Sequence, residues 1–473
     1  MQLREEEIRR AKSIFECPGN AVPDALSKVM EEGDTGKRVC LLFMIICGRI
    51  ALRSECYYLE SIFDRRSLCE LIEICRTFPS VDSDVVVPKS KILIDVTHTM
   101  GYSHLSGIQR TVYVISVALE QKWDVIFVKN VHEKGLTPLS DVEAEAFLGK
   151  YAADFDGDVT SGECTLDRDT LIWPEYCTLL CSELLDNDRV FVYYGLLKSA
   201  AHSVAVFYDL IPITHPQYCH PGIVGAHVEY AGILSGFDRV LAISASACAE
   251  LRGFLASSGK RHEHVEPLLL PDFNCFTGDC ERGEKGRPRI AYISTMDPRK
   301  NHLRLFAACE ELWTSGMDFE LHLIGGVGWR NEVHQSELHR LVVSGYPVIR
   351  PQKFVSDREI MELYFSCDAT VFCSEAEGYG LPIIESLGLG VPAIVSNCGS
   401  MKELADLCGG CHLIDPFDVG SIKEGIKTVL TDDEYRGGLK SSIDLSGLPS
   451  VEQYVLELMA DSKECNVSTF AKL

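Results

Sequence analysis

The sequence lacks an apolar run long enough to cross a bilayer. Its longest early run, Val39 to Gly48, has ten residues, whereas a membrane-spanning helix needs about 20. We expect this segment to form a buried helix instead. The first fifteen residues are charged and amphipathic, without the apolar core of an export signal. These two absences predict a cytoplasmic protein.

An excess of basic residues is also missing. Lys and Arg number 45 against 69 Asp and Glu, which gives a formal net charge of -24. Such a chain repels phosphate backbones, so general nucleic-acid binding is excluded. The charge balance gives no electrostatic help to binding an anionic membrane. A small basic patch can still hold one anionic ligand, because local fields decide that.

Cysteine is plentiful, but it lacks the spacing of a disulfide framework or a zinc site. The 20 cysteines are scattered, and we expect reduced thiols. The stretch CGGCH, Cys408 to His412, resembles a haem-attachment pattern but has no second paired set for zinc. Among 69 acidic residues, Asp-x-Asp pairs arise by chance; they are Asp82/Asp84, Asp154/Asp156, Asp167/Asp169 and Asp186/Asp188. We predict no metal site.

Strand-like and helix-like segments alternate from about residue 89 onward. Ile92 to Val96 is a short, nearly continuous apolar run, which is typical of a buried parallel strand. Such alternation predicts an α/β fold with parallel sheets that are covered on both faces. Further strands are expected at residues 124–128, 170–174, 189–195, 203–212, 239–244, 290–294, 320–326, 346–351, 369–374, 392–396 and 411–416.

Changes in composition divide the chain into five parts. A stretch rich in Gly, Pro and charge separates two halves of alternating elements and is expected to be a linker. The predicted parts are a helical N-terminal extension (1–88), a first doubly wound, Rossmann-like domain (89–270), the linker (271–288), a second doubly wound, Rossmann-like domain (289–448), and a helix and tail that pack back on the N-terminal domain (449–473).

Two glutamates flank a turn in the C-terminal half. In SEAEGYGLPIIES, Glu377 precedes the Gly-Tyr-Gly turn, and Glu385 lies beyond Pro382. Proline is favoured at the first position of a helix, so the pattern predicts a strand, a turn and a helix at the carboxyl edge of a sheet. Free amides at a helix start attract phosphate, whereas the carboxylates suit sugar hydroxyls. A sugar nucleotide meets both demands; solvated or capping glutamates are the alternative.

A basic pair occurs in the same half. In IAYISTMDPRKNH, Arg299 and Lys300 follow Pro298 near the expected start of a helix. Positive charge at this place would neutralise a diphosphate. The alternative is an ordinary solvated pair, since most charged side chains are exposed.

Five motifs, in this order, resemble the retaining glycosyltransferases of family four, in particular bacterial mannosyltransferase-type enzymes that build surface polysaccharides. They are ILIDVTHTMGYSHLSGIQR, FYDLIPITHPQY, FDRVLAISASACAEL, TMDPRKNH and EGYGLPIIES. The resemblance covers about residues 91–460. It implies the GT-B fold, in which two Rossmann-like doubly wound domains face each other across a cleft. The N-terminal helical extension is an addition to that fold.

The resemblance implies roles for the matching residues of the C-terminal half. Glu377 would face the donor sugar, and Glu385 would bond the ribose of the nucleotide. Arg299 and Lys300 would hold the diphosphate. The turn itself is expected to contact the donor, with the amides of Gly380 and Leu381 orienting sugar and phosphate; its residues are Gly378, Tyr379, Gly380 and Leu381.

In the N-terminal half, GIQR, from Gly107 to Arg110, would form a loop that closes over donor or acceptor. Asp209 would lie at the tip of a strand and face the acceptor. Many members of the family have histidine before this aspartate, and here Tyr208 stands in its place, so no role is carried over for that histidine. His215 is either a residue of the cleft or an ordinary loop histidine.

The activity implied by the resemblance is transfer of a hexose, mannose from GDP-mannose, with retained anomeric configuration. Basic residues and helix amides would stabilise the departing diphosphate, with no cofactor and no metal. The acceptor would be a glycan or a lipid-linked glycan of O-antigen or capsule, which fits contact with the inner face of the membrane and with other polysaccharide-assembly proteins. Two alternatives are a sugar-nucleotide epimerase and a non-catalytic scaffold that uses residues 1–85 for interaction.

Overall fold

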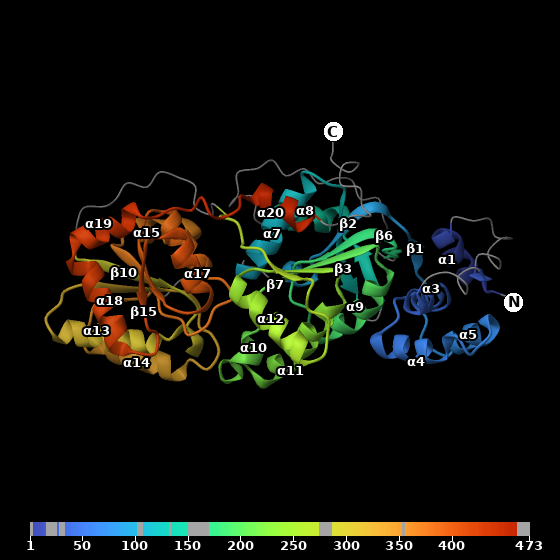
Figure 1. Cartoon of the computed structure of the whole chain (residues 1–473), viewed down its shortest axis with the longest axis horizontal. Coiled ribbons are helices and arrows are strands. Elements are labelled where there is room, and N and C mark those ends of the chain that lie inside the picture. Colours follow the sequence, from blue (N-terminus) through green and yellow to red (C-terminus); the bar gives the residue numbers. More distant parts are fainter. Residues whose placement is uncertain are drawn as a thin grey trace.

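The computed structural model describes residues 3–15, 26–27, 34–101, 107–131, 134–149, 170–273, 286–351 and 355–460. Three parts lie in a row: N-terminal helices, a first α/β lobe and a second α/β lobe (Figure 1). Most of the predicted linker, residues 274–285, and the predicted tail, residues 461–473, lie outside the described residues. Within the described part of the chain, no helix is long and apolar enough to cross a membrane.

The N-terminal lobe contains a seven-stranded sheet in the order β4-β3-β2-β6-β7-β8-β9. All neighbouring strands run parallel except β3 and β4. The strands are β2 (Lys89–Asp95), β3 (Val125–Val131), β4 (Gly135–Pro138), β6 (Tyr176–Cys181), β7 (His202–Phe207), β8 (Arg239–Ala242) and β9 (Val265–Pro267). Their helices are α6 (Thr97–Met100), α7 (Gly107–Glu120), α8 (Asp141–Gly149), α9 (Asn187–Ser199), α10 (Ile211–Thr214), α11 (Pro221–Ile233) and α12 (Ala245–Ser257), with the 3-10 turns η2 (Pro216–Tyr218) and η3 (Leu234–Gly236).

The C-terminal lobe contains a six-stranded, wholly parallel sheet in the order β12-β11-β10-β13-β14-β15. Its strands are β10 (Arg289–Ile293), β11 (Glu320–Ile324), β12 (Val348–Ile349), β13 (Ala369–Phe372), β14 (Ala393–Ser396) and β15 (Cys411–Ile414). The helices are α13 (His302–Thr314), α14 (Glu332–Val343), α15 (Asp357–Ser366), α16 (Leu381–Gly388), α17 (Gly399–Cys408), α18 (Val419–Thr431) and α19 (Asp433–Ser441). Every residue of β13 and β14 is buried, which explains why these strands appear in the sequence as continuous apolar runs.

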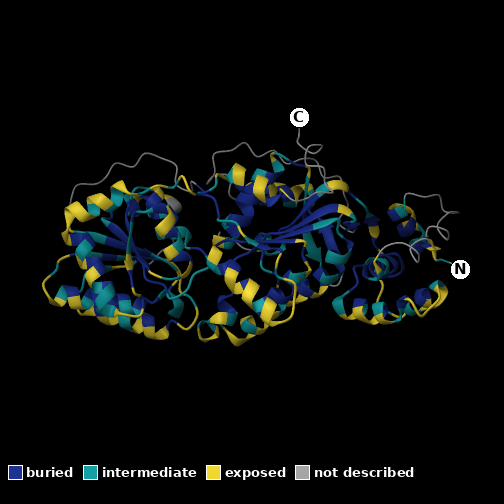
Figure 2. Ribbon diagram, in the orientation of Figure 1, coloured by how far each residue is buried: buried dark blue, intermediate teal, exposed yellow. Residues whose placement is uncertain are grey.

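The N-terminal helices belong to the core of the first lobe. They are α1 (Glu5–Phe15), α3 (Thr35–Cys47), α4 (Arg53–Phe63) and α5 (Leu68–Cys75). Helix α3 contains the predicted buried apolar segment and is buried along almost its whole length (Figure 2). Its side chains join one hydrophobic cluster with α9 and with one face of the seven-stranded sheet. The short strands β1 (Asp84–Val86) and β5 (Thr170–Ile172) pair with each other beside this cluster.

One predicted strand is wrong. The run at residues 189–195, RVFVYYG, lies inside helix α9. Asp186 caps this helix, because its carboxylate accepts a hydrogen bond from the amide of Arg189 at 3.0 Å. The helix packs against α3 and α4 on one side and α11 on the other, so apolar residues occur all around it. A helix buried on several sides loses the periodic pattern that distinguishes it from a strand.

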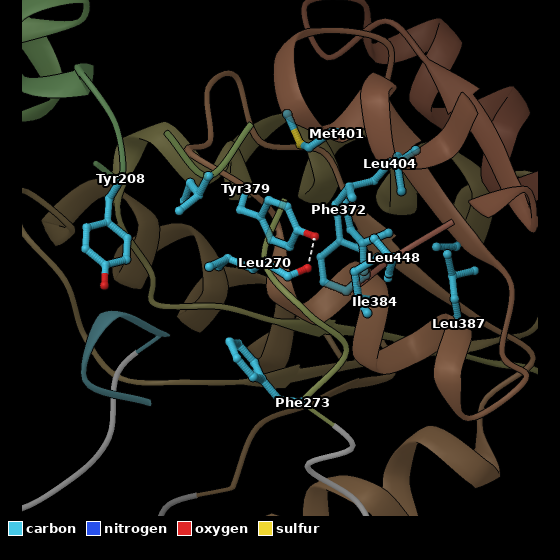
Figure 3. Close-up of a cluster of buried hydrophobic side chains, with 14 of the residues drawn as sticks. Tyr208, Leu270, Phe273, Phe372, Tyr379, Ile384, Leu387, Met401, Leu404 and Leu448 are labelled. Atoms are coloured by element: carbon cyan, nitrogen blue, oxygen red, sulfur yellow. Dashed lines mark hydrogen bonds between the residues drawn. The ribbon is translucent and has the colours of Figure 1, made fainter. Parts of the chain in front are cut away.

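The last described helix, α20 (Val451–Leu458), returns to the first lobe and packs on α7 (Figure 1). Arg239 at the start of β8 donates a hydrogen bond from Nη1 to the carbonyl of Glu457 at 2.6 Å. The chain therefore crosses between the lobes twice, and both crossings are held by polar contacts or by packing. At the first crossing, the hydroxyl of Tyr379 donates to the carbonyl of Leu270 at 2.8 Å (Figure 3).

Candidate functional site between the two lobes

The loops that follow β10 and β13 bring three charged side chains together. These strands are neighbours in the C-terminal sheet, so their carboxyl ends meet at one edge. Arg299, in the 3-10 turn η4 (Pro298–Lys300), donates from Nη1 to Oε2 of Glu377 at 2.6 Å. Lys300 donates from Nζ to the other oxygen of the same carboxylate. One glutamate thus accepts from both cations.

Burial makes this cluster electrostatically strong. Burial alone would raise the pKa of Glu377, but Arg299 and Lys300 outweigh it and hold the pKa at about 2. Burial lowers the pKa of Lys300, which Glu377 partly counteracts. The sequence predicted cations for a diphosphate and a carboxylate for a sugar. In the structure these groups contact one another, so a ligand that engages both has to rearrange this cluster.

The backbone around the cluster is held in an uncommon conformation. Asn301, next to Lys300, has a left-handed φ of 62°, which costs a non-glycine residue about 1 kcal/mol. Its side-chain amide donates to the carbonyls of Cys373 at 2.9 Å and Pro416 at 2.7 Å. These bonds fasten the loop that carries the cations to the segment that leads to Glu377 and to the loop after β15, and strain of this kind is often found at ligand sites.

The second glutamate contacts the opposite lobe. Glu385 lies one turn inside α16, and its Oε1 accepts from Nη1 of Arg110 at 2.8 Å. The hydroxyl of Tyr364 in α15 donates to Oε2 at 3.2 Å. Arg110 lies in the first turn of α7. The GIQR motif is therefore the start of a helix, and the prediction of a loop is wrong; Gly107 and Arg110 are nevertheless brought to the junction of the lobes.

Gly378 is the point where the two lobes approach most tightly around the turn. A Cβ atom at this position would lie 2.6 Å from the carbonyl oxygen of Tyr208 and 3.3 Å from Oδ2 of Asp209. The hydroxyl of Ser244 also donates to the carbonyl of Gly378 at 2.9 Å. Only glycine fits here without displacing the backbone. The structure thus places Asp209, just beyond β7, directly beside the glutamate-bearing turn.

The remaining residues of the turn are fixed by backbone conformation or by packing between the lobes. Gly380 has a φ of 112° and precedes α16, where Pro382 occupies the first turn. The side chain of Tyr379 is buried between the lobes (Figure 3), so only its backbone is left to contact a donor. Leu381 lies against Gly107 of the other lobe, where a Cβ would be 3.1 Å from its Cδ1.

Tyr208 and His215, which lie near Asp209 in the sequence, differ in their contacts. Tyr208, which replaces the family histidine, is buried and donates from its hydroxyl to the carbonyl of Ser182 at 2.6 Å. It therefore offers no free polar group beside Asp209. His215 contacts the hydroxyl of Thr214 at 2.9 Å, and its ring lies parallel to that of Tyr218 with centroids 6.0 Å apart. Asp209 itself accepts from the amide of Ile211 at 3.0 Å.

Sequence reasoning missed two further carboxylates that join the lobes. Glu375 accepts hydrogen bonds from Arg304 of its own lobe and from the hydroxyl of Tyr218 in the other lobe. Glu403 in α17 accepts from the amides of Ala245 at 2.9 Å and Ser246 at 2.7 Å, at the start of α12. Glu375 stands two residues before Glu377 in SEAEG, which is the only signal that the sequence offered.

The candidate metal motifs are used otherwise. Asp82 and Asp84 both pair with Arg9, at 2.6 and 2.8 Å, and Asp186 caps α9. His412 of the CGGCH stretch contacts the hydroxyl of Tyr435 at 2.8 Å. Among the residues described, no group of three His, Cys, Asp or Glu is placed to hold a metal ion. The pairs Asp154/Asp156 and Asp167/Asp169 lie outside the described residues.

Comparison with protein families finds a match within the C-terminal lobe. Residues 281–442 match the family model described as "Glycosyl transferases group 1", and this range contains Arg299, Lys300, Glu377 and Glu385. The match lies within the C-terminal lobe and covers about a third of the chain. The resemblance expected from the sequence is confirmed by this match.

Relatives of this chain include two proteins of Escherichia coli. The serotype-specific mannosyltransferase WbdA is 26% identical over 342 residues, which cover 67% of this chain and 38% of the relative. The O-antigen chain mannosyltransferase B is 36% identical over 146 residues, 31% of this chain and 37% of the relative. The chain thus spans about two fifths of the length of these curated relatives.

Solved structures confirm the predicted GT-B fold. The sucrose-phosphate synthase of Thermosynechococcus elongatus matches with a TM-score of 0.53 and 15% identity, over 80% of this chain and 99% of that one. HepE of Anabaena, whose crystal structure is in complex with UDP and glucose, matches with a TM-score of 0.51 and 13% identity, over 80% and 96% of the two chains. At these identities the likeness concerns the fold of the chain and not its substrates.

Proposed function

We propose that this chain is a retaining glycosyltransferase that moves mannose from GDP-mannose to a glycan acceptor. Support comes from the family match of the C-terminal lobe and from relatives that are themselves named as mannosyltransferases. The acceptor is a growing surface polysaccharide, free or lipid-linked, and the enzyme works at the inner face of the membrane with other polysaccharide-assembly proteins. The reaction uses no metal and no cofactor beyond the sugar nucleotide.

The cluster of Arg299, Lys300 and Glu377 is the observation that carries this proposal. It holds two cations and one carboxylate, largely buried, at the carboxyl edge of a parallel sheet, where ligands bind in folds of this kind. When the donor enters, its diphosphate takes over the two cations, and Glu377 is released to accept hydrogen bonds from the sugar hydroxyls. An anionic ligand can replace the carboxylate without leaving either cation buried alone.

Charge stabilisation drives the chemical step. The bond between the anomeric carbon and the diphosphate breaks early, and its electron pair goes to the leaving oxygen. Arg299, Lys300 and the first amides of α16 stabilise that oxygen, each worth about 3 kcal/mol by analogy with oxyanion sites. The acceptor hydroxyl attacks from the face that the diphosphate leaves, which retains the configuration, and its proton passes to an oxygen of the departing diphosphate. Asp209 lies beside Gly378 and faces this acceptor.

The test is sugar transfer by the wild type and by Glu377→Gln. Glutamine keeps the shape of the side chain and an acceptor oxygen, whereas Glu377→Ala would remove the carboxylate that both buried cations contact and would disturb the fold. With GDP-mannose and a manno-oligosaccharide acceptor, we expect kcat/KM to fall at least ~100-fold, the effect of losing one transition-state contact. The control is Glu362→Gln on the exposed face of α15, which should leave kcat/KM unchanged.

The same assay separates the alternatives. A new sugar formed from GDP-mannose alone would identify an epimerase. A protein that neither binds nor converts any sugar nucleotide would be a scaffold. Transfer by Glu377→Gln within about threefold of the wild type would overturn the role given to this residue, since one lost contact to the reacting group should cost far more.

A further inference from the structure

Two loops from opposite lobes meet beside the cluster and carry an exposed tryptophan. Trp329 follows β11 in the C-terminal lobe and is 43% exposed. Its ring contacts the edge of His220, with centroids 4.9 Å apart at 77°. In the same loop, Arg330 donates from Nη1 to the carbonyl of Gln217 at 3.3 Å. Both lobes therefore contribute to the surface around Trp329.

This surface is held in place by the backbone. Arg330 has a left-handed φ of 51°, one of three such non-glycine residues in the described chain, and this conformation persists only where the surroundings impose it. Gly328 lies so close to the preceding loop that a Cβ there would be 2.9 Å from the Cβ of Asp297. Two glycines of LIGGVGWR, Gly325 and Gly328, thus serve close packing, and the loop presents Trp329 in a fixed position.

The surface is close to the proposed reaction site on both sides. On the C-terminal side, Asp297 accepts from the amide of Arg299 at 3.1 Å and lies against Gly328. On the N-terminal side, the hydroxyl of Tyr218 donates to Glu375, two residues before Glu377. Tyr218 and His220 belong to the same short stretch of chain. The Trp329 surface therefore adjoins the cluster that contains Arg299 and Glu377.

The composition of the surface is unusual for this chain. Residues 210–228 contain no Asp, Glu, Lys or Arg over nineteen positions, although the whole chain has 24% charged residues. The exposed side chains of these two loops are apolar, aromatic or neutral polar apart from Arg330; they include Gln217, His220, Val327 and Trp329. Ile223 and Val228, which follow His220 in α11, are exposed as well. The charged residues placed beside the contact of Trp329 with His220 are Arg330 and Asp297, which lies against Gly328.

We propose that Trp329, with His220 and Gln217, forms a subsite for a sugar unit of the acceptor glycan beyond the one that receives the new residue. This inference rests on the proposed function. A neutral sugar offers an apolar C–H face for the indole ring and hydroxyl groups for the imidazole and the carboxamide. A membrane surface is the weaker match, because anionic lipids favour clusters of Lys and Arg and this stretch has none.

The test compares acceptors of increasing length. With GDP-mannose as donor, we measure KM and kcat for methyl α-mannoside and for α-linked mannobiose, mannotriose and mannotetraose. In the wild type KM should fall as the acceptor grows. In Trp329→Ala the KM for mannotetraose should rise about tenfold, the value of one aromatic contact, while kcat, the KM for GDP-mannose and the KM for the monosaccharide stay the same.

Matched variants and a binding measurement complete the design. Trp329→Phe should restore most of the length dependence. Tyr176→Ala, which removes a ring of similar exposure (46%) at the amino-terminal end of β6, should have no effect. Mannotetraose should also quench tryptophan fluorescence in the wild type but not in Trp329→Ala, and this reading does not depend on transfer.

Several outcomes overturn the inference. A KM independent of acceptor length, or an unchanged length dependence in Trp329→Ala, would show that no sugar binds there. A membrane role would also overturn the inference. It would be indicated if vesicles of phosphatidylglycerol and phosphatidylethanolamine bound the wild type but not Trp329→Ala, while both proteins bound mannotetraose equally well. Absence of transfer with every sugar nucleotide would overturn the proposed function instead, and the fluorescence measurement would still decide whether Trp329 binds a glycan.

Discussion

Arg110 and Glu385 form an ion pair across the two lobes, with Nη1 and Oε1 2.8 Å apart. Both side chains are only 15% exposed, so neither is well solvated. Glu385 is also the residue that we expect to bond the ribose of the donor. Arg110 therefore contacts the carboxylate that the ribose is expected to bind. When the donor binds, the ribose either displaces Arg110 from Glu385 or shares this carboxylate with it.

The first prediction concerns Arg110→Ala. Removing one partner of a buried ion pair costs about 3 kcal/mol, because Glu385 then stays buried without the positive charge of Arg110. The free energy of unfolding should therefore fall by roughly this amount in the absence of ligand. Saturating GDP should recover part of the loss, since ribose hydroxyls then donate to Glu385. Thermal unfolding with and without GDP measures both effects.

A surface pair provides the control for this prediction. Arg53 and Glu229 are 2.7 Å apart but are 31% and 44% exposed, so Arg53→Ala should cost less than about 1 kcal/mol and should not respond to GDP. If GDP leaves the deficit of Arg110→Ala unchanged, Glu385 does not bind the ribose.

The second prediction concerns Gly378→Ala. The added methyl group would lie 2.6 Å from the carbonyl oxygen of Tyr208, so the turn and the first lobe have to move apart. We expect stability to fall by about 1–3 kcal/mol, as for overpacking in a core. The rate of sugar transfer should fall strongly as well, because small displacements of reacting groups raise the activation barrier. Activity and unfolding midpoint are measured on the same sample.

Gly437→Ala is the matched control, because nothing lies within 4 Å of a Cβ at that position in α19. It should keep full activity and gain slightly in stability, as alanine favours helix. Normal transfer by Gly378→Ala would show that the close approach of Gly378 to Tyr208 and Asp209 has no part in catalysis.

Much of the fold follows from local sequence signals. The strands β2, β10, β13 and β14 are short apolar runs between turns, and they were predictable because a strand buried on both faces has this pattern. The same reasoning failed at residues 189–195. Helix α9 is covered on several sides, so its apolar residues carry no helical period and the run looks like a strand.

The site was predictable only in part, for a related reason. The residue types of Glu377, Glu385, Arg299 and Lys300 pointed to a charged site, because carboxylates and cations around a helix start need a ligand or one another. Which of these groups contact one another depends on how the two lobes dock. The bonds from Arg110 to Glu385 and from Tyr218 to Glu375 join residues more than 150 positions apart, and no local pattern encodes them.

The third prediction concerns pH and a buried carboxylate outside the cluster. Glu183 accepts from the amides of His98 at 2.8 Å and Thr99 at 2.6 Å. Burial and the nearby carboxylate of Asp95 raise its pKa to about 7, although Arg189 acts in the opposite direction. The folded protein then keeps a proton that the unfolded chain releases between pH 4.5 and 7, so stability should fall as pH rises through this window.

Glu183→Gln should remove this pH dependence. Relative to the wild type, the variant should gain up to ~1.4 kcal/mol per pH unit between pH 5 and 7 in urea unfolding. Glu143→Gln is the control: Lys129 and Ser140 outweigh burial and hold the pKa of Glu143 at about 2, so its pH effect lies below pH 4.5. Parallel curves for the wild type and Glu183→Gln would refute the raised pKa.

The last prediction decides whether the N-terminal helices are a separate interaction module or part of the first lobe. Phe43 of α3 is fully buried in the cluster shared with α9 and the seven-stranded sheet, with its ring 5.5 Å from that of Phe78. Phe43→Ala should lower the free energy of unfolding by about 3–5 kcal/mol. Because the core is shared, the loss should appear in the same cooperative transition as unfolding of the sheet.

The control is Tyr57→Ala in α4. This ring is 55% exposed, so its removal should lower the free energy of unfolding far less. Urea unfolding followed by far-ultraviolet and near-ultraviolet circular dichroism tests this: an early, separate helical transition in Phe43→Ala, with the rest of the protein and its sugar transfer unaffected, would show that residues 1–85 fold as a unit of their own.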